Sequence, residues 1–112
     1  MLARMQGAGV YLEDLCFHTQ QAVEKAVKAL LIQRHVQFPY VHDIAELLTV
    51  LEAAGQELPP TIRQAERLTR FAVFTRYPGL APPISQEEYT EAVGIAGAVI
   101  QWAEHLLRRL PE

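Results

Sequence analysis

The sequence is poor in several residue types, and each shortage excludes a class of protein. The single cysteine, Cys16, has no partner for an intramolecular disulfide, which is typical of proteins from reducing compartments. The longest uncharged apolar stretch, residues 92–103, is too short to span a bilayer. The N-terminus also lacks the basic-then-apolar pattern of a secretory signal. We therefore expect a cytoplasmic protein that makes no use of a membrane.

Other missing patterns exclude common catalytic and metal chemistry. The chain has no glycine-rich phosphate loop and no Gly-x-Ser-x-Gly nucleophile elbow. Its 4 histidines and 1 cysteine never occur at zinc-ligand spacing, so we expect no metal site and no cofactor. The net charge of -3 excludes a globally basic nucleic-acid-binding protein but leaves room for a local basic site.

Length and hydrophobic patterning predict one helical domain over residues 1–112. Half of the chain is hydrophobic, which is enough for a core without disulfides or metal. Helical periodicity, interrupted by breaks rich in proline and glycine, predicts helices over 10–35, 44–54, 62–77 and 86–110. The pattern predicts an all-α, up-and-down bundle of four to five helices. Residues 1–6 are too few for a stable helix, so we expect the first helix to be short or truncated.

Capping patterns mark three of the helix starts. They are Asp43 with Glu46, Thr61 with Gln64, and Ser85 with Glu88. The last helix is apolar on more than one face and contains Gly94 and Gly97, each of which costs about 1 kcal/mol in a helix interior. This predicts close approach of another helix, either within the bundle or from a second subunit.

A polar strip follows the first long helix. His18, Gln21, Lys25 and Lys28 are spaced three, four and three residues apart and share one side of the helical wheel. The strip contains both lysines of the chain, and it predicts a grip for an anionic group such as a phosphate. The alternative is a solvated helix face on which Glu24 pairs with Lys28 one turn later.

A second constellation depends on the bundle topology. Because the end of one helix and the start of the next share a pole in an up-and-down bundle, we expect His42, Asp43, Arg76 and Tyr77 to lie near one another. They predict either a polar ligand pocket or a structural clamp in which Asp43 caps a helix and pairs with Arg76. A third candidate, the stripe of Arg63, Arg67, Arg70 and Phe74, is either an RNA or acidic-partner site or a solvated face.

Three ordered motifs resemble the HEPN domain family. The run Phe17-His18-Thr19-Gln20-Gln21 through Leu31 resembles the signature helix of these domains. His42-Asp43-Ile44 and then Thr75-Arg76-Tyr77-Pro78 follow in the expected order. The resemblance covers about residues 3–110 and implies a bundle of four long helices that commonly forms homodimers. A helix usually precedes the Phe-His-x-Gln-Gln run in such domains, and residues 2–4 look like only its last turn.

The resemblance also implies a partner. Small stand-alone HEPN proteins are typically encoded beside a minimal nucleotidyltransferase and bind it, and in some toxin–antitoxin pairs the HEPN chain is a metal-independent RNase. That RNase branch carries an arginine followed, after four to six residues, by a histidine. Arg76 is followed instead by Tyr77, Pro78 and Gly79. We therefore expect a non-catalytic module that binds the nucleotidyltransferase and a nucleotide or another phosphate-bearing ligand.

Two other functions stay open. An RNase toxin with an atypical site would use His42 as the base and Arg76 as the cation at the phosphate of an RNA. A structural or regulatory homodimer would use the polar residues only as a clamp. For the binding module, the expected ligand- or partner-binding residues are His42, Asp43, Arg76, Tyr77, Lys25, Lys28, Gln21 and His18.

Overall fold

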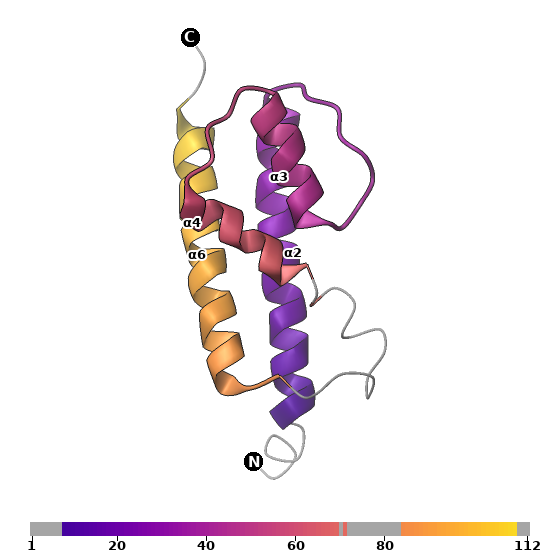
Figure 1. Cartoon of the computed structure of the whole chain (residues 1–112), viewed down its shortest axis with the longest axis vertical. Coiled ribbons are helices and arrows are strands. Elements are labelled where there is room, and N and C mark those ends of the chain that lie inside the picture. Colours follow the sequence, from indigo (N-terminus) through magenta and orange to yellow (C-terminus); the bar gives the residue numbers. More distant parts are fainter. Residues whose placement is uncertain (1–7, 70, 72–83, 110–112) are drawn as a thin grey trace.

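Helices form every regular element in the part of the chain that the structure, a computed structural model, describes: residues 8–69, 71 and 84–109. The longest are α2 (Ala8–Gln33) and α6 (Gln86–Arg108), which lie side by side (Figure 1). The helix α3 (Ile44–Ala53) packs against the second half of α2. The short α4 (Pro60–Arg63) leads directly into the 3-10 helix η1 (Gln64–Leu68), and together they cross the bundle. The predicted all-α bundle is confirmed.

The helices α2, α3 and α6 all point in the same direction, so these three helices do not alternate as the predicted up-and-down topology requires. At the end of α2, Gln33 Nε2 donates a 3.0 Å hydrogen bond to the carbonyl of Leu107, near the end of α6. Just after α2, the Arg34 guanidinium donates to the side chain of Gln56, just after α3. The connection 34–43 therefore runs back along α2 before α3 begins (Figure 1).

The core residues of α2 and α3 recur at helical spacing on one side of each helix. Residues that share one arc of each helix are fully removed from solvent, and their contact joins the two helices to α6 and η1. The fully buried residues on these two sides are Val23, Val27, Leu30, Leu31, Ile44, Leu47, Leu48 and Leu51.

None of the described helices combines the length and the apolar character that a membrane crossing requires.

The buried residues of α6 are Ala92, Ile95, Ala96, Val99 and Ala103, whereas Val93, on another side of the helix, is 43% exposed. Gly94 and Gly97 are exposed too, and no described atom lies within 4 Å of the position that a Cβ would take on either. The close approach expected at these glycines is therefore not made by the described part of the chain.

The ends of the helices confirm two of the three capping predictions. Asp43 caps α3 by accepting from the amide of Ala45, and Ser85 and Glu88 form a complete capping box at α6. The prediction at Thr61 is wrong, because the helix begins at Pro60 after Pro59 and has no side-chain cap. Proline suits the first helical position, since its fixed φ is helical and its missing N–H would have had no partner there.

The predicted helix over 62–77 is less regular than expected in its described part. It begins as the single α-turn of α4 and continues as the 3-10 helix η1 to Leu68, and Phe71 is again helical. Most of the remainder of the predicted helix, including Arg76 and Tyr77, lies outside the described residues.

Candidate functional site

A buried carboxylate, Glu24, organises the polar residues in the middle of α2. It is 6% exposed, and Lys28 one turn later donates to its Oε2 at 2.7 Å. His42, from the connection that runs back along α2, places Nδ1 2.9 Å from the same oxygen. Because an ionised carboxylate only accepts hydrogen bonds, this contact assigns a proton to Nδ1. The expected pairing of Glu24 with Lys28 is confirmed.

Gln20 completes this group, which we call the Glu24 cluster (Gln20, Glu24, Lys28 and His42). Its side chain is fully buried, and its Nε2 donates to Glu24 Oε1 at 3.0 Å and to the main-chain oxygen of His42 at 3.3 Å. These two acceptors determine the orientation of the amide. Its Oε1 is left without a hydrogen-bond donor among the described residues. The cluster therefore attaches the end of the connection 34–43 to α2 through both side chain and main chain.

The surroundings of Glu24 keep it ionised. Burial by itself would raise the pKa of this carboxyl, because a charge is costly away from water. The hydrogen bonds from Lys28, Gln20 and His42, together with the positive charge of Lys28, outweigh burial and lower the pKa of Glu24 below its ordinary value. The cluster is thus a buried anion with a lysine and a histidine as its cationic or donor partners.

An exposed aromatic ring borders the Glu24 cluster. Tyr40 is 91% exposed, the ammonium of Lys28 lies 5.5 Å from the centre of its ring, and the ring of His42 lies 6.2 Å away. A lysine within about 6 Å of an aromatic face is attracted by the ring quadrupole. His42 is itself 47% exposed at its side chain, so the cluster reaches solvent at His42 and Tyr40.

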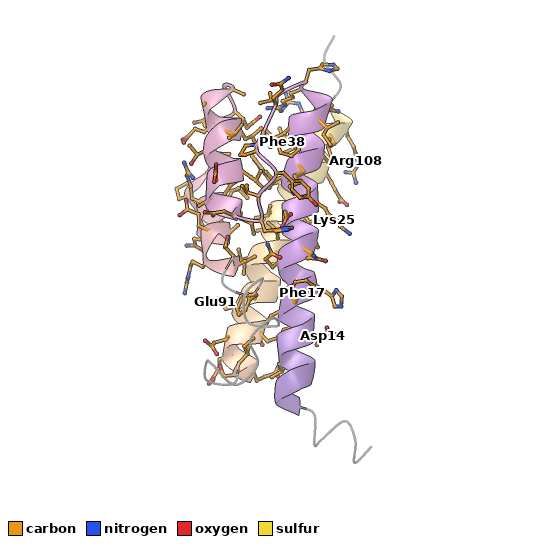
Figure 2. All side chains as sticks on the ribbon, turned by 90° about the vertical axis from the view of Figure 1, so that its right-hand side faces the viewer. Asp14, Phe17, Lys25, Phe38, Glu91 and Arg108 are labelled. Carbon is orange, nitrogen blue, oxygen red and sulfur yellow. The ribbon has the colours of Figure 1, made fainter. Side chains whose placement is uncertain are left out.

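The other residues of the predicted α2 strip stay apart from this cluster. Lys25 is exposed, one turn before Lys28 and on the outer side of the helix (Figure 2). Gln21 is half-buried. His18 lies further towards the start of α2 and pairs with Asp14 at 3.5 Å, with both side chains largely in solvent. Of the strip residues, Lys28 therefore joins His42 through Glu24, whereas Lys25 lies one turn away on α2 and His18 lies further off.

Of the predicted constellation of His42, Asp43, Arg76 and Tyr77, only His42 and Asp43 belong to the described residues. His42 lies beside the middle of α2 and not at its end, because the connection 34–43 runs back along the helix. Asp43 caps α3, as expected for a clamp. The hydroxyl of Thr69, directly after η1, accepts a 3.0 Å hydrogen bond from the amide of Ile44. The end of η1 therefore lies at the start of α3.

The arginine stripe is ion-paired where the structure describes it. Arg63 pairs with Glu52 at 2.6 Å and with Glu66 at 2.9 Å, and Arg67 pairs with Glu91 at 3.1 Å. These bonds connect α4 and η1 to the neighbouring helices, which agrees with a solvated, structural face. Arg70 and Phe74 lie outside the described residues.

A pocket of about 600 Å³ lies between η1 and the first half of α6, and it shares no residue with the Glu24 cluster. Its floor is apolar and its rim carries Arg67 and three glutamates, all of which already have polar partners among the described residues. No group of three or more potential metal-ligating side chains occurs in the described ranges. The lining residues are Glu66, Arg67, Leu68, Phe71, Glu88, Glu91, Ala92 and Ile95.

The sequence interpretation missed Gln20 and Tyr40 and gave Glu24 only a local role. Gln20 lies four residues after the buried Cys16 and three before the buried Val23, and Glu24 lies three before the buried Val27. Both polar residues therefore stand on the side of α2 that faces the core. Polar residues at such positions signal a buried polar contact, because a polar group is buried only with partners. The partner, His42, could not be identified this way, since its approach depends on the course of the connection.

Taken together, these features define an all-α bundle with a buried carboxylate that pairs with a lysine and a histidine. The family model for the HEPN domain matches residues 5–106, which is nearly the whole chain. The chain belongs to the HEPN domain family. Comparisons with curated proteins and with solved structures return no match.

Proposed function

We propose that this protein is a non-catalytic HEPN binding module that holds a nucleotide or another phosphate-bearing ligand beside α2 and docks a minimal nucleotidyltransferase. The observation that carries the ligand proposal is that Lys28 and His42 meet at Glu24, while Lys25, the other lysine of the chain, lies one turn away on the same helix. No described carboxylate pairs with Lys25, whereas Lys28 is held by Glu24.

The sequence around Arg76 favours binding over cleavage. Metal-independent RNA cleavage needs a base at the 2′-hydroxyl and a separate cation at the phosphate. The contact of His42 Nδ1 with Glu24 leaves Nε2 available as a base, but Arg76 carries no histidine in the four- to six-residue spacing of the RNase branch. We therefore prefer the binding module to the RNase toxin.

The ligand proposal is tested with AMP and the Lys25→Gln variant, measured by titration calorimetry. Removal of one charge-assisted hydrogen bond to the phosphate should weaken AMP binding roughly tenfold. Arg108→Gln removes the same charge from the exposed end of α6 and should leave the affinity unchanged. Equal affinity of Lys25→Gln and the unmodified protein, or no AMP binding at all, would overturn the proposal. A single-stranded RNA incubated with the same samples should stay intact, and cleavage that is lost in His42→Ala would establish the RNase function instead.

Partner docking is tested separately, by co-expression with a minimal nucleotidyltransferase, which we expect to be encoded next to this chain. We expect the two proteins to co-purify and to elute as one complex of defined stoichiometry. Elution of two separate species at micromolar concentration would contradict this part of the proposal and would favour the structural or regulatory homodimer. The homodimer itself is proposed to form through the open face of α6.

A further inference from the structure

Tyr40 is displayed outward by a connection whose other apolar residues face inward. Val36, Phe38 and Val41 are partly buried and pack against the core, whereas Tyr40 is 91% exposed. Figure 2 shows Phe38 between α2 and α3. The fold therefore does not use the Tyr40 ring for packing, although Phe38 and Val41 on either side of it are used in that way.

The backbone around Tyr40 is held in place. The amide of Val41 donates to the carbonyl of Pro39 at 3.0 Å, which closes a three-residue γ-turn with Tyr40 at its tip. Pro39 restricts the chain before the tip. Directly after the turn, His42 is bound to α2 by its side chain through Glu24 and by its main-chain oxygen through Gln20. The ring thus stands on a fixed base, and its own side chain has only two rotatable bonds to order.

The groups around the ring define what can bind to it. The Lys28 ammonium lies 5.5 Å from the ring centre, and the exposed Lys25 follows on the adjacent turn of α2. A flat ring can stack on the open side of Tyr40 while an anionic group on the same molecule reaches the lysines. A nucleobase connected through a sugar to a phosphate has both parts.

We infer that Tyr40 is a stacking subsite for the aromatic base of the ligand. The inference rests on the proposed ligand site and adds the recognition of the base to it. Since every base offers an aromatic face, such a subsite selects for the presence of a base more than for its identity.

The test compares AMP with ribose 5-phosphate, which has the same sugar and phosphate but no base, by titration calorimetry. The unmodified protein should bind AMP roughly tenfold more tightly than ribose 5-phosphate, a gain typical of one stacked base. Tyr40→Ala should abolish this preference without weakening ribose 5-phosphate binding, and Tyr40→Phe should retain it. Because Tyr40 is almost fully exposed, these variants should fold normally.

A matched control is Ile32→Ala, which removes another exposed apolar side chain from the outer side of α2. It should leave the preference for AMP intact. If AMP and ribose 5-phosphate bind equally well, or if the preference survives in Tyr40→Ala, the stacking inference is wrong while the phosphate site stands. If neither compound binds, the proposed function fails and this inference fails with it.

Discussion

Glu24 is the residue on which the polar interior depends. Its carboxylate is almost fully buried and accepts hydrogen bonds from Lys28, Gln20 and His42, which belong to two segments of the chain. Removing one partner of a buried ion pair leaves the other without compensation, and the cost is several kcal/mol when both charges are buried. Here Lys28 and His42 retain partial access to water, which reduces that cost.

We expect Glu24→Gln to lower the free energy of unfolding at pH 7 by about 2 kcal/mol, measured by urea denaturation. Because the pKa of Glu24 is lowered in the folded protein, its contribution is fully present above the pKa of an unfolded glutamate, about 4.3. The contribution is lost as pH falls through the lower, folded-state pKa. The difference between the two proteins should therefore shrink progressively below about pH 4.3.

Glu104→Gln provides the control for this comparison. Glu104 pairs with Arg108 one turn later, but both side chains are more than half exposed, so its loss should cost less than about 0.5 kcal/mol. A Glu24→Gln effect as small as that of Glu104→Gln, or one independent of pH, would show that the Glu24 cluster does not stabilise the fold.

At the scale of the elements, two helices end in the same motif with different residues at its critical position. After α2, the main-chain amide of His35 donates to the carbonyl of Ile32, and the amide of Val36 donates to the carbonyl of Leu31. The φ of His35 is 59°. After α3, Gly55 occupies the equivalent position with a φ of 107°. This left-handed position favours glycine, since a Cβ is crowded there.

The comparison predicts opposite effects of exchanging the two residue types. His35→Gly should raise the free energy of unfolding by about 0.5 kcal/mol, because glycine adopts the left-handed backbone conformation without strain and the exposed His35 side chain makes no packing contribution that would be lost. Gly55→Ala should lower it by about 1 kcal/mol. Thermal unfolding of the two variants side by side checks the prediction, and a change of the same sign in both would contradict the assignment of the motif.

At the scale of the whole molecule, α6 has an open face that no described part of the chain covers. Val93, Gly94 and Gly97 are exposed along it, and the glycines lower helix stability without making room for any described part of the chain. A second copy packed on this face would account for both glycines, because small residues allow two helix backbones to approach closely. Its interface would also cover Val93.

Substitution of Gly97 distinguishes a solvent-exposed helix face from an interface. Gly97→Glu should convert the proposed dimer to a monomer, because it places a charge and a long side chain in the contact. Light scattering coupled to gel filtration measures this change. The helix itself should tolerate the change, since nothing described lies near the Cβ position and glutamate is a better helix former than glycine. A protein that is already monomeric, or a variant that stays dimeric, would exclude this face as the dimer interface.

The sequence by itself determined the helical class, the core stripes of α2 and α3 and the caps at Asp43 and Ser85. These features are local, because apolar periodicity and capping geometry involve residues within about four positions of one another. The pairing of Glu24 with Lys28 belongs to the same group. The 3-10 geometry of Gln64–Leu68 was not predicted, because periodicity and capping patterns do not distinguish it from an α-helix.

Only the tertiary structure decided which residues form the Glu24 cluster. His42 reaches Glu24 because the connection 34–43 runs back along α2, and eighteen residues separate the two partners in the sequence. The exposure of Tyr40 and the open face of α6 depend in the same way on which surfaces the other elements cover. Contacts between distant residues follow from the path of the whole chain, whereas helix starts, stripes and i,i+4 pairs follow from the residues themselves.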